Sequence, residues 1–104
     1  MNNIHKEIIN EFEEKIREIS NPESLFLIGS NKEKELDLTS DLDIIIIVEN
    51  NINCYEYVKQ ITPILKNLTV KYNIMVNAYP IKSRIFKEEK SEFLNNIRQN
   101  GVKL

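Results

Sequence analysis

Two aspartates separated by one residue, Asp41 and Asp43, stand directly before four consecutive isoleucines, Ile44–Ile47. In an extended strand, residues i and i+2 point to the same side, so both carboxylates would project together with their Cα atoms about 6.6 Å apart. Two carboxylates at this spacing can share divalent cations. Hard oxygen ligands without a nearby His or Cys favour Mg²⁺ or Mn²⁺ over zinc. Bound cations would also offset the repulsion between two acids beside a buried strand.

A glycine-serine pair precedes the two acids. Gly29 and Ser30 end a short apolar stretch, Leu25–Ile28. A glycine lets phosphate oxygens approach backbone N–H groups that a Cβ would obstruct, and the serine hydroxyl adds a hydrogen bond. Taken singly, an Asp-x-Asp is often only a strand entry or a capping turn, and a Gly-Ser is often only a turn. Their order between two apolar strands favours a triphosphate held between the Gly-Ser turn and metal ions on the acids.

The first half of the chain predicts three elements around these residues. Apolar residues at spacings of three and four predict an amphipathic helix from Ile4 to Ile19, which Pro22 follows. A short buried strand is expected at Leu25–Ile28, then a polar connecting loop. The β-branched run Leu42–Val48 predicts a strand that is covered on both faces of a sheet.

The second half predicts two helices with a strand between them. Apolar periodicity indicates a helix over Tyr55–Leu68, with Pro63 as a point where it would kink or divide. The segment Val70–Ile81 alternates between apolar and mixed positions, as a strand does. Ser91 would cap a last helix, and Gly101 would take the left-handed conformation after its end. The order α, β, β, α, β, α predicts an α/β (α+β) fold around a small mixed sheet flanked by helices.

Composition narrows the class of protein. A length of 104 residues suits one domain, 1–104, and a net charge of −2 with a pI near 5.5 opposes a nucleic-acid-binding role. Cys54 is the only cysteine, so neither an internal disulfide nor a thiolate metal cage is expected, and Cys54 itself would be an incidental thiol at a helix start. His5 lacks companion ligands in the sequence, which predicts an exposed or capping role. The charged N-terminus and the absence of a long apolar run favour a cytoplasmic location.

The stretch GSNKEKELDLTSDLDIIIIV resembles the signature of the minimal nucleotidyltransferases, a branch of the DNA polymerase β-like superfamily. That signature is Gly-Ser, then Ser/Thr-Asp-x-Asp, then an apolar strand, and the similarity continues through KYNIMVNAYPI and SEFLNNIRQNGVKL. The resemblance implies the nucleotidyltransferase fold, with its polymerase β-like palm. Matched position by position, the resemblance implies that Gly29 and Ser30 bind phosphate and that Asp41 and Asp43 are the catalytic metal ligands. Ser40 is the matching small polar residue.

The chain departs from the family pattern at two places. Members commonly carry Arg-Gly in the loop after Gly-Ser, where this chain has Glu33-Lys34, so Lys32 or Lys34 would supply the positive charge toward the nucleotide. Many members also have a third carboxylate on the later strand, but Val70–Lys87 contains no Asp or Glu. Asn77 lies near the expected place and offers an amide oxygen, which is not a base.

The resemblance implies a magnesium-dependent enzyme that moves AMP from ATP to an acceptor hydroxyl and releases pyrophosphate. Relatives that modify antibiotics or tRNA have an additional acceptor domain, and this sequence leaves no room for one, so a separate protein partner is expected. In the resembled family this partner is frequently a helical HEPN toxin, which is neutralised by binding or by AMP attached to a tyrosine. The alternative is a catalytically silent antitoxin or binding module. The oligomeric state, homo- or hetero-oligomeric, stays open.

Overall fold

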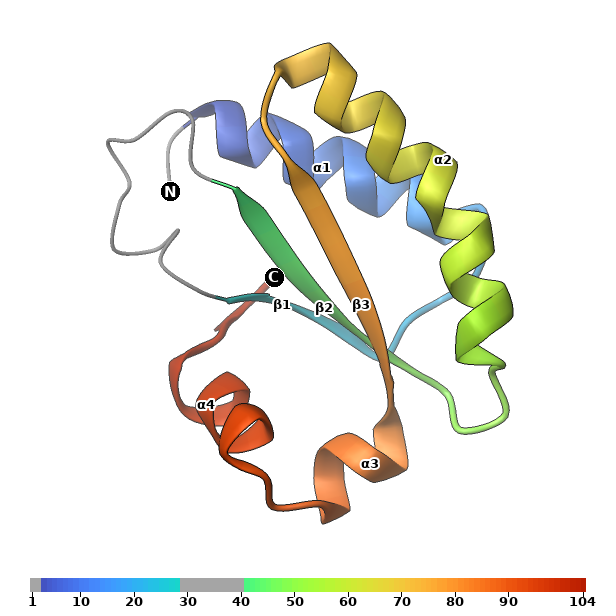
Figure 1. The fold of residues 1–104 in the computed structure, drawn as a ribbon, viewed down its shortest axis with the longest axis vertical. Coiled ribbons are helices and arrows are strands. Elements are labelled where there is room, and N and C mark those ends of the chain that lie inside the picture. The colour runs from blue at the N-terminus through green and yellow to red at the C-terminus, as the bar shows by residue number, and fades with distance from the viewer. Residues whose placement is uncertain (1–2, 29–40) are drawn as a thin grey trace.

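The computed structural model describes residues 3–28 and 41–104 of the chain. In chain order the elements are α1 (Asn3–Arg17), β1 (Ser24–Ile28), β2 (Leu42–Val48), α2 (Cys54–Tyr72), β3 (Val76–Lys82), α3 (Ser83–Glu88), α4 (Glu92–Asn100) and β4 (Val102–Lys103). The predicted order of six elements is present, and α3 and β4 are additional. A mixed sheet flanked by helices confirms the predicted α/β (α+β) fold class (Figure 1).

The sheet places β2 at its centre. Within the described residues the strand order is β3-β2-β1-β4, with β1 antiparallel to both β2 and β4, and β2 parallel to β3. The parallel pair is joined by α2, as a parallel connection requires a crossover element. Asp43, near the start of β2, therefore has Ile28 of β1 on one side and Asn77 of β3 on the other.

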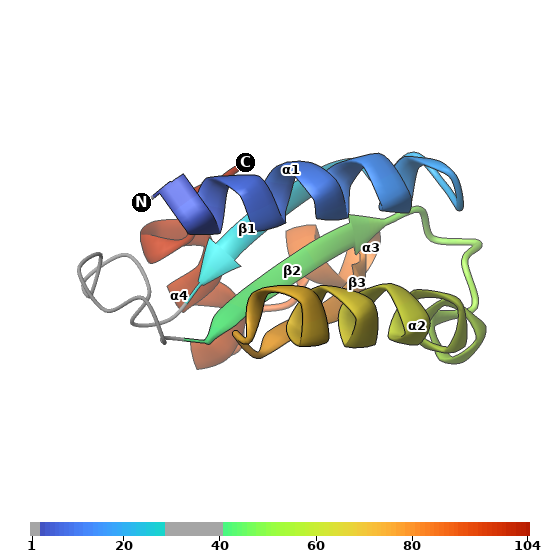
Figure 2. The same cartoon turned by 90° about the horizontal axis from the view of Figure 1, so that it is seen from above.

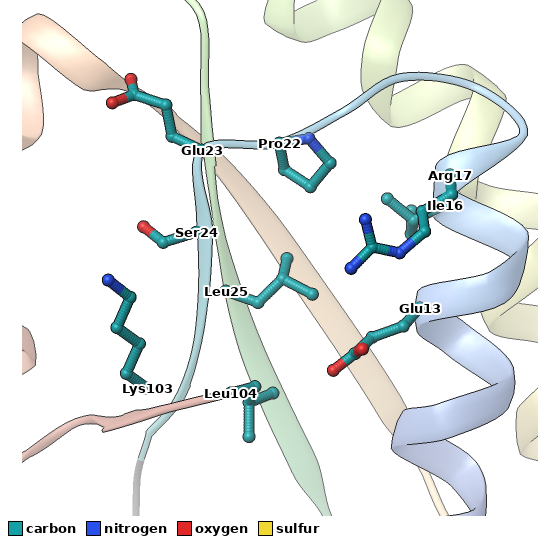
Figure 3. A pocket seen from close by; sticks show the side chains of 9 residues that line it. All are labelled: Glu13, Ile16, Arg17, Pro22, Glu23, Ser24, Leu25, Lys103 and Leu104. Atoms are coloured by element: carbon teal, nitrogen blue, oxygen red, sulfur yellow. The ribbon is translucent and has the colours of Figure 1, made fainter.

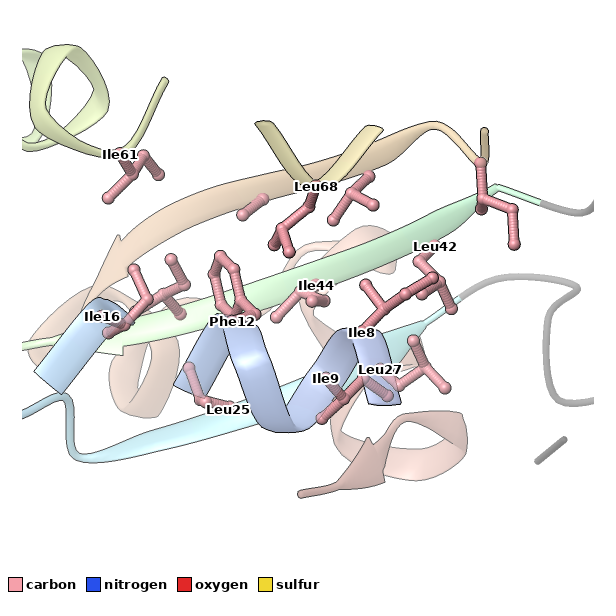
Figure 4. Packing of buried hydrophobic residues seen from close by; sticks show 14 of the residues in the cluster. Ile8, Ile9, Phe12, Ile16, Leu25, Leu27, Leu42, Ile44, Ile61 and Leu68 are labelled. Atoms are coloured by element: carbon pink, nitrogen blue, oxygen red, sulfur yellow. The ribbon is translucent and has the colours of Figure 1, made fainter. Parts of the chain in front are cut away.

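Helices cover both faces of this sheet. Helices α1 and α2 lie on one face, whereas α3 and α4 lie on the opposite face (Figure 1, Figure 2). The strand β2 alternates between the two layers. Ile44 and Ile46 belong to the core cluster under α1 and α2, in which Figure 4 shows Ile44. Ile45 and Ile47 belong to a second cluster with Leu94 and Ile97 of α4. The prediction that Leu42–Val48 is a strand covered on both faces is confirmed, with the same bounds.

Helix α2 is longer than predicted and displaces the start of the following strand. The helix continues through Pro63 to Tyr72 and ends at Asn73, which takes the left-handed conformation at φ 56°. Strand β3 consequently begins at Val76, so the prediction of a strand from Val70 was wrong over its first residues. An asparagine in this conformation is a common helix terminator, because its short polar side chain tolerates positive φ.

Two predictions about single residues were also wrong. Gly101 follows α4 with φ −68°, not in the left-handed region. Its glycine is instead explained by a close approach, since a Cβ there would lie 2.6 Å from the carbonyl oxygen of Ile97. His5 is only 1% exposed, because it lies on the same face of α1 as Ile8 and Phe12. Ser91 does cap α4 as predicted, accepting a hydrogen bond from the Leu94 N–H.

Candidate functional site

Asp43 is the second residue of β2, and Asp41 directly precedes the strand. Leu42 stands between them and is fully buried in the core cluster that α1 and α2 cover. Because successive residues of a strand point to opposite faces, Asp43 is turned to the other face. Asp41 is exposed and Asp43 is half-buried. The common orientation of the two carboxylates stays a prediction, because Asp41 precedes the first residue of β2.

Asn77 is the polar residue that β3 brings to this pair. It is the register partner of Asp43 in the parallel β2–β3 ladder, and its side-chain Nδ2 donates a hydrogen bond of 3.1 Å to Asp43 Oδ1. An ionised carboxylate only accepts hydrogen bonds, so the amide must present its nitrogen to Asp43. The structure thus places Asn77 beside the aspartates, where the sequence predicts a residue in place of a third carboxylate.

Two exposed apolar side chains flank Asn77 on the same edge of the sheet. Met75 is 51% exposed and Tyr79 is 49% exposed, and each is two residues from Asn77. Strand alternation directs Tyr79 to the face of Asp43, and Met75 directly precedes the strand. Sequence reasoning placed them with Asn77 on the mixed face but did not connect them with the acids, because only the β2–β3 register brings them together.

The donor set at this site fits a hard divalent cation. Asp41 and Asp43 supply carboxylate oxygens and Asn77 an amide, a set that suits Mg²⁺ or Mn²⁺ and not a soft metal. Among residues 3–28 and 41–104, no group of three or more His, Cys, Asp or Glu side chains is arranged to hold a metal ion. In the described residues the negative charge at the site therefore comes from the two aspartates.

The other predicted site residues lie outside the described residues. These are Gly29, Ser30, Lys32, Lys34 and Ser40. The described residues that border this segment nevertheless lie close together. Ile28, which is bonded to Gly29, is the register partner of Asp43.

A pocket of about 120 Å³ lies elsewhere, between α1, the start of β1 and the residues of the C-terminal strand (Figure 3). Ser24 in its wall pairs with Ile47, at the end of β2 opposite to Asp43. Its volume is below the roughly 300–1,000 Å³ of pockets that bury a drug-sized ligand. The pocket is therefore small and lies away from Asp43.

The clearest shifts in pKa belong to the helix layer. Glu11 of α1 accepts hydrogen bonds from Lys71 Nζ at 2.8 Å and from the Tyr72 hydroxyl at 3.0 Å, and these bonds lower the pKa of Glu11. Burial raises the pKa of Tyr57, whose hydroxyl accepts a hydrogen bond from Ser20. The contacts of Glu11 join α1 to α2 on the face away from Asp43, so their role is structural.

Comparison with known proteins identifies the family. No curated protein and no solved structure matches the chain. A protein-family model described as "Nucleotidyltransferase domain" matches residues 7–101, which is nearly the whole chain. In the part that the structure describes, no helix is long and apolar enough to cross a membrane. The family match supports nucleotidyl transfer as the general activity, and it shows that the chain belongs to the nucleotidyltransferase domain family.

Proposed function

We propose that this chain is a Mg²⁺-dependent nucleotidyltransferase that moves AMP from ATP to a hydroxyl group of a partner protein. The observation that carries the proposal is the position of Asp41 and Asp43 at the start of β2, the central strand. Asp43 lies in this strand with Asp41 directly before it, and Asn77 donates a hydrogen bond to Asp43. An oxygen-only donor set of this kind suits the handling of phosphates through a divalent cation.

In the proposed reaction the acceptor hydroxyl attacks the α-phosphorus of ATP. A bond forms between the acceptor oxygen and this phosphorus, the bond to the β-phosphate oxygen breaks, and pyrophosphate leaves. Asp41 and Asp43 would hold Mg²⁺ or Mn²⁺, which when bound supplies positive charge to the phosphates. Such a reaction depends largely on positioning and electrostatics, so a small domain can carry it.

Strand β3 has no carboxylate that could accept the proton of the acceptor hydroxyl. Val70–Lys87 contains no Asp or Glu, and the side chain next to Asp43 is the amide of Asn77. A positioned general base typically contributes about 10²–10⁴-fold to the rate. The chain alone should therefore bind Mg²⁺-ATP and turn over slowly, with the proton taken by solvent, by an acid elsewhere in the chain such as Asp37, or by a group on the partner.

The phosphates are proposed to lie against Gly29 and Ser30, with Ser40 as a further small polar contact. The pairing of Ile28 with Asp43 supports this assignment, because the chain leaves β1 next to the proposed metal ligand. A glycine at such a point lets phosphate oxygens approach the backbone N–H groups.

Replacing both Lys32 and Lys34 by alanine should weaken the binding of ATP by about tenfold, the effect of losing a hydrogen bond to a charged group worth about 1.5 kcal/mol. AMP binding should change less, because the lysines are proposed to contact the β- and γ-phosphates. Calorimetric titration of both nucleotides in the presence of Mg²⁺ measures the difference. Alanine at both Lys59 and Lys66, on the opposite side of the sheet in α2, is the matched control. Equal losses for ATP and AMP would contradict the assignment.

The acceptor is proposed to be a helical protein of the HEPN type, modified on a tyrosine, so that the pair acts as toxin and antitoxin. The resemblance to the minimal nucleotidyltransferases supports this partner class. The exposed Met75 and Tyr79 beside Asn77 support an acceptor with an apolar or aromatic group near its hydroxyl.

Intact-mass measurement of the partner after incubation with ATP, Mg²⁺ and this chain tests the proposal. We expect one AMP adduct per modified hydroxyl, and no adduct with Asp41→Asn. A stable complex without any adduct would support the second candidate, a silent antitoxin, which the amide of Asn77 in place of a carboxylate favours. Rapid transfer by the chain alone to RNA or to a small molecule would contradict the proposed partner.

A further inference from the structure

The contact between Asn77 and Asp43 suggests a more specific role for the amide. We propose that Asn77 is a positioning residue that orients the Asp43 carboxylate and limits the site to one divalent cation. This inference rests on the proposed function, because it concerns the metal site formed by Asp41 and Asp43.

The backbone on both sides of the contact is fixed. The Leu42 N–H, next to Asp43, donates to the Met75 carbonyl at 2.9 Å, and the Val76 N–H, next to Asn77, donates to Thr69 Oγ1 at 3.1 Å. Both side chains are half-buried, which restricts their rotamers. The hydrogen bond of 3.1 Å from Asn77 Nδ2 to Oδ1 then selects one orientation of the carboxylate and leaves Oδ2 as its other oxygen for a cation. Partners that orient a metal ligand typically contribute about 10–100-fold to metal affinity.

The negative charge of the site limits the number of divalent cations that it can hold. Asp41 and Asp43 together contribute a charge of −2, and the amide of Asn77 adds none. Within residues 3–28 and 41–104, no third His, Cys, Asp or Glu joins them in a group that could hold a metal. One divalent cation neutralises this charge. Two ions about 3.5–4 Å apart would leave an excess of positive charge that the described residues do not compensate.

Titration with Mn²⁺ alone, without nucleotide, tests both parts of the inference. Binding is followed by calorimetry and by electron paramagnetic resonance, which detects magnetic coupling between two adjacent Mn²⁺ ions. The unchanged chain should bind one ion. Asn77→Leu, which keeps the shape and removes the donor, should bind one ion about 10–100-fold more weakly. Asn77→Asp should bind two coupled ions, because it adds a carboxylate at the register position of Asp43.

Asn67→Asp is the control for charge, since it makes the same change on an exposed position of α2. It should leave the affinity and the number of ions unchanged. Far-UV circular dichroism of each variant checks the fold, and Asn77→Asp remains informative if Asn77→Leu does not fold.

The outcomes separate this inference from the metal site itself. Equal Mn²⁺ affinity of Asn77→Leu and the unchanged chain would overturn the positioning role. Two ions in the unchanged chain, or one ion in Asn77→Asp, would overturn the limit on ion number. If the unchanged chain bound no Mn²⁺, or if Asp43→Asn bound it equally well, the proposed metal site would be wrong and the inference with it.

Discussion

Replacing Asp43 by asparagine is expected to lower the rate of nucleotidyl transfer by at least about 10²–10³-fold, the loss that follows removal of one electrostatic group from an active site. The substitution keeps the size of the side chain and removes its charge. Its amide oxygen can still accept the hydrogen bond from Asn77 Nδ2, so the β2–β3 contact does not have to break. Mg²⁺-ATP is expected to raise the melting temperature of the unchanged chain, because a ligand selective for the folded state stabilises it by mass action. The variant should lose this rise.

Without metal, Asp43→Asn should be as stable as the unchanged chain or slightly more stable, since it removes the repulsion between Asp41 and Asp43. Glu49→Gln is the matched control, because Glu49 is an exposed acid that directly follows the other end of β2. It should retain both transfer and the thermal shift. A melting curve of the unchanged chain that does not respond to millimolar Mg²⁺ and ATP would contradict the site, and a variant that fails to fold would indicate a structural role for Asp43.

The central strand could be predicted from sequence because it depends on a local pattern. The apolar run Ile44–Val48 indicates the strand that the structure has at Leu42–Val48, and strand alternation predicts a common face for Asp41 and Asp43. The contact between Asp43 and Asn77, in contrast, could not be predicted from a local pattern. It depends on the register between β2 and β3, which the crossover helix α2 and the packing around it determine. Only the family resemblance, not periodicity, placed Asn77 near the acids.

The wrong predictions arose where the same local sequence pattern is compatible with two different structures. The segment that contains Val70 and Met75 alternates like a strand, but its first residues also continue the helical spacing of α2, and Asn73 decides the boundary by ending the helix. His5 was expected in an exposed or capping role because it has no companion ligands in the sequence. The helical spacing from His5 to Ile8 and Phe12 was the signal that indicated burial.

Replacing Phe12 by alanine is expected to destabilise the fold by about 3–5 kcal/mol, a large share of the roughly 5–15 kcal/mol that keeps a domain folded. Phe12 is fully buried, and its ring points from α1 toward β2 within the core cluster (Figure 4). Urea denaturation should show a lower midpoint with the same dependence on urea concentration, since the loss is one of packing. The control Phe93→Ala, at a position 53% exposed on α4, should change stability by at most about 0.5 kcal/mol.

The same variant separates the core from the site. Phe12 lies on the α1 side of the sheet, whereas Asp43 faces the opposite side. At a temperature where Phe12→Ala remains folded, its Mn²⁺ affinity should therefore equal that of the unchanged chain. A Mn²⁺ affinity that falls by tenfold or more in the folded variant would show that the packing of α1 affects the position of the residues at the start of β2. In that case the register of β2 and β3 would not be sufficient to hold Asp43 and Asn77 in place.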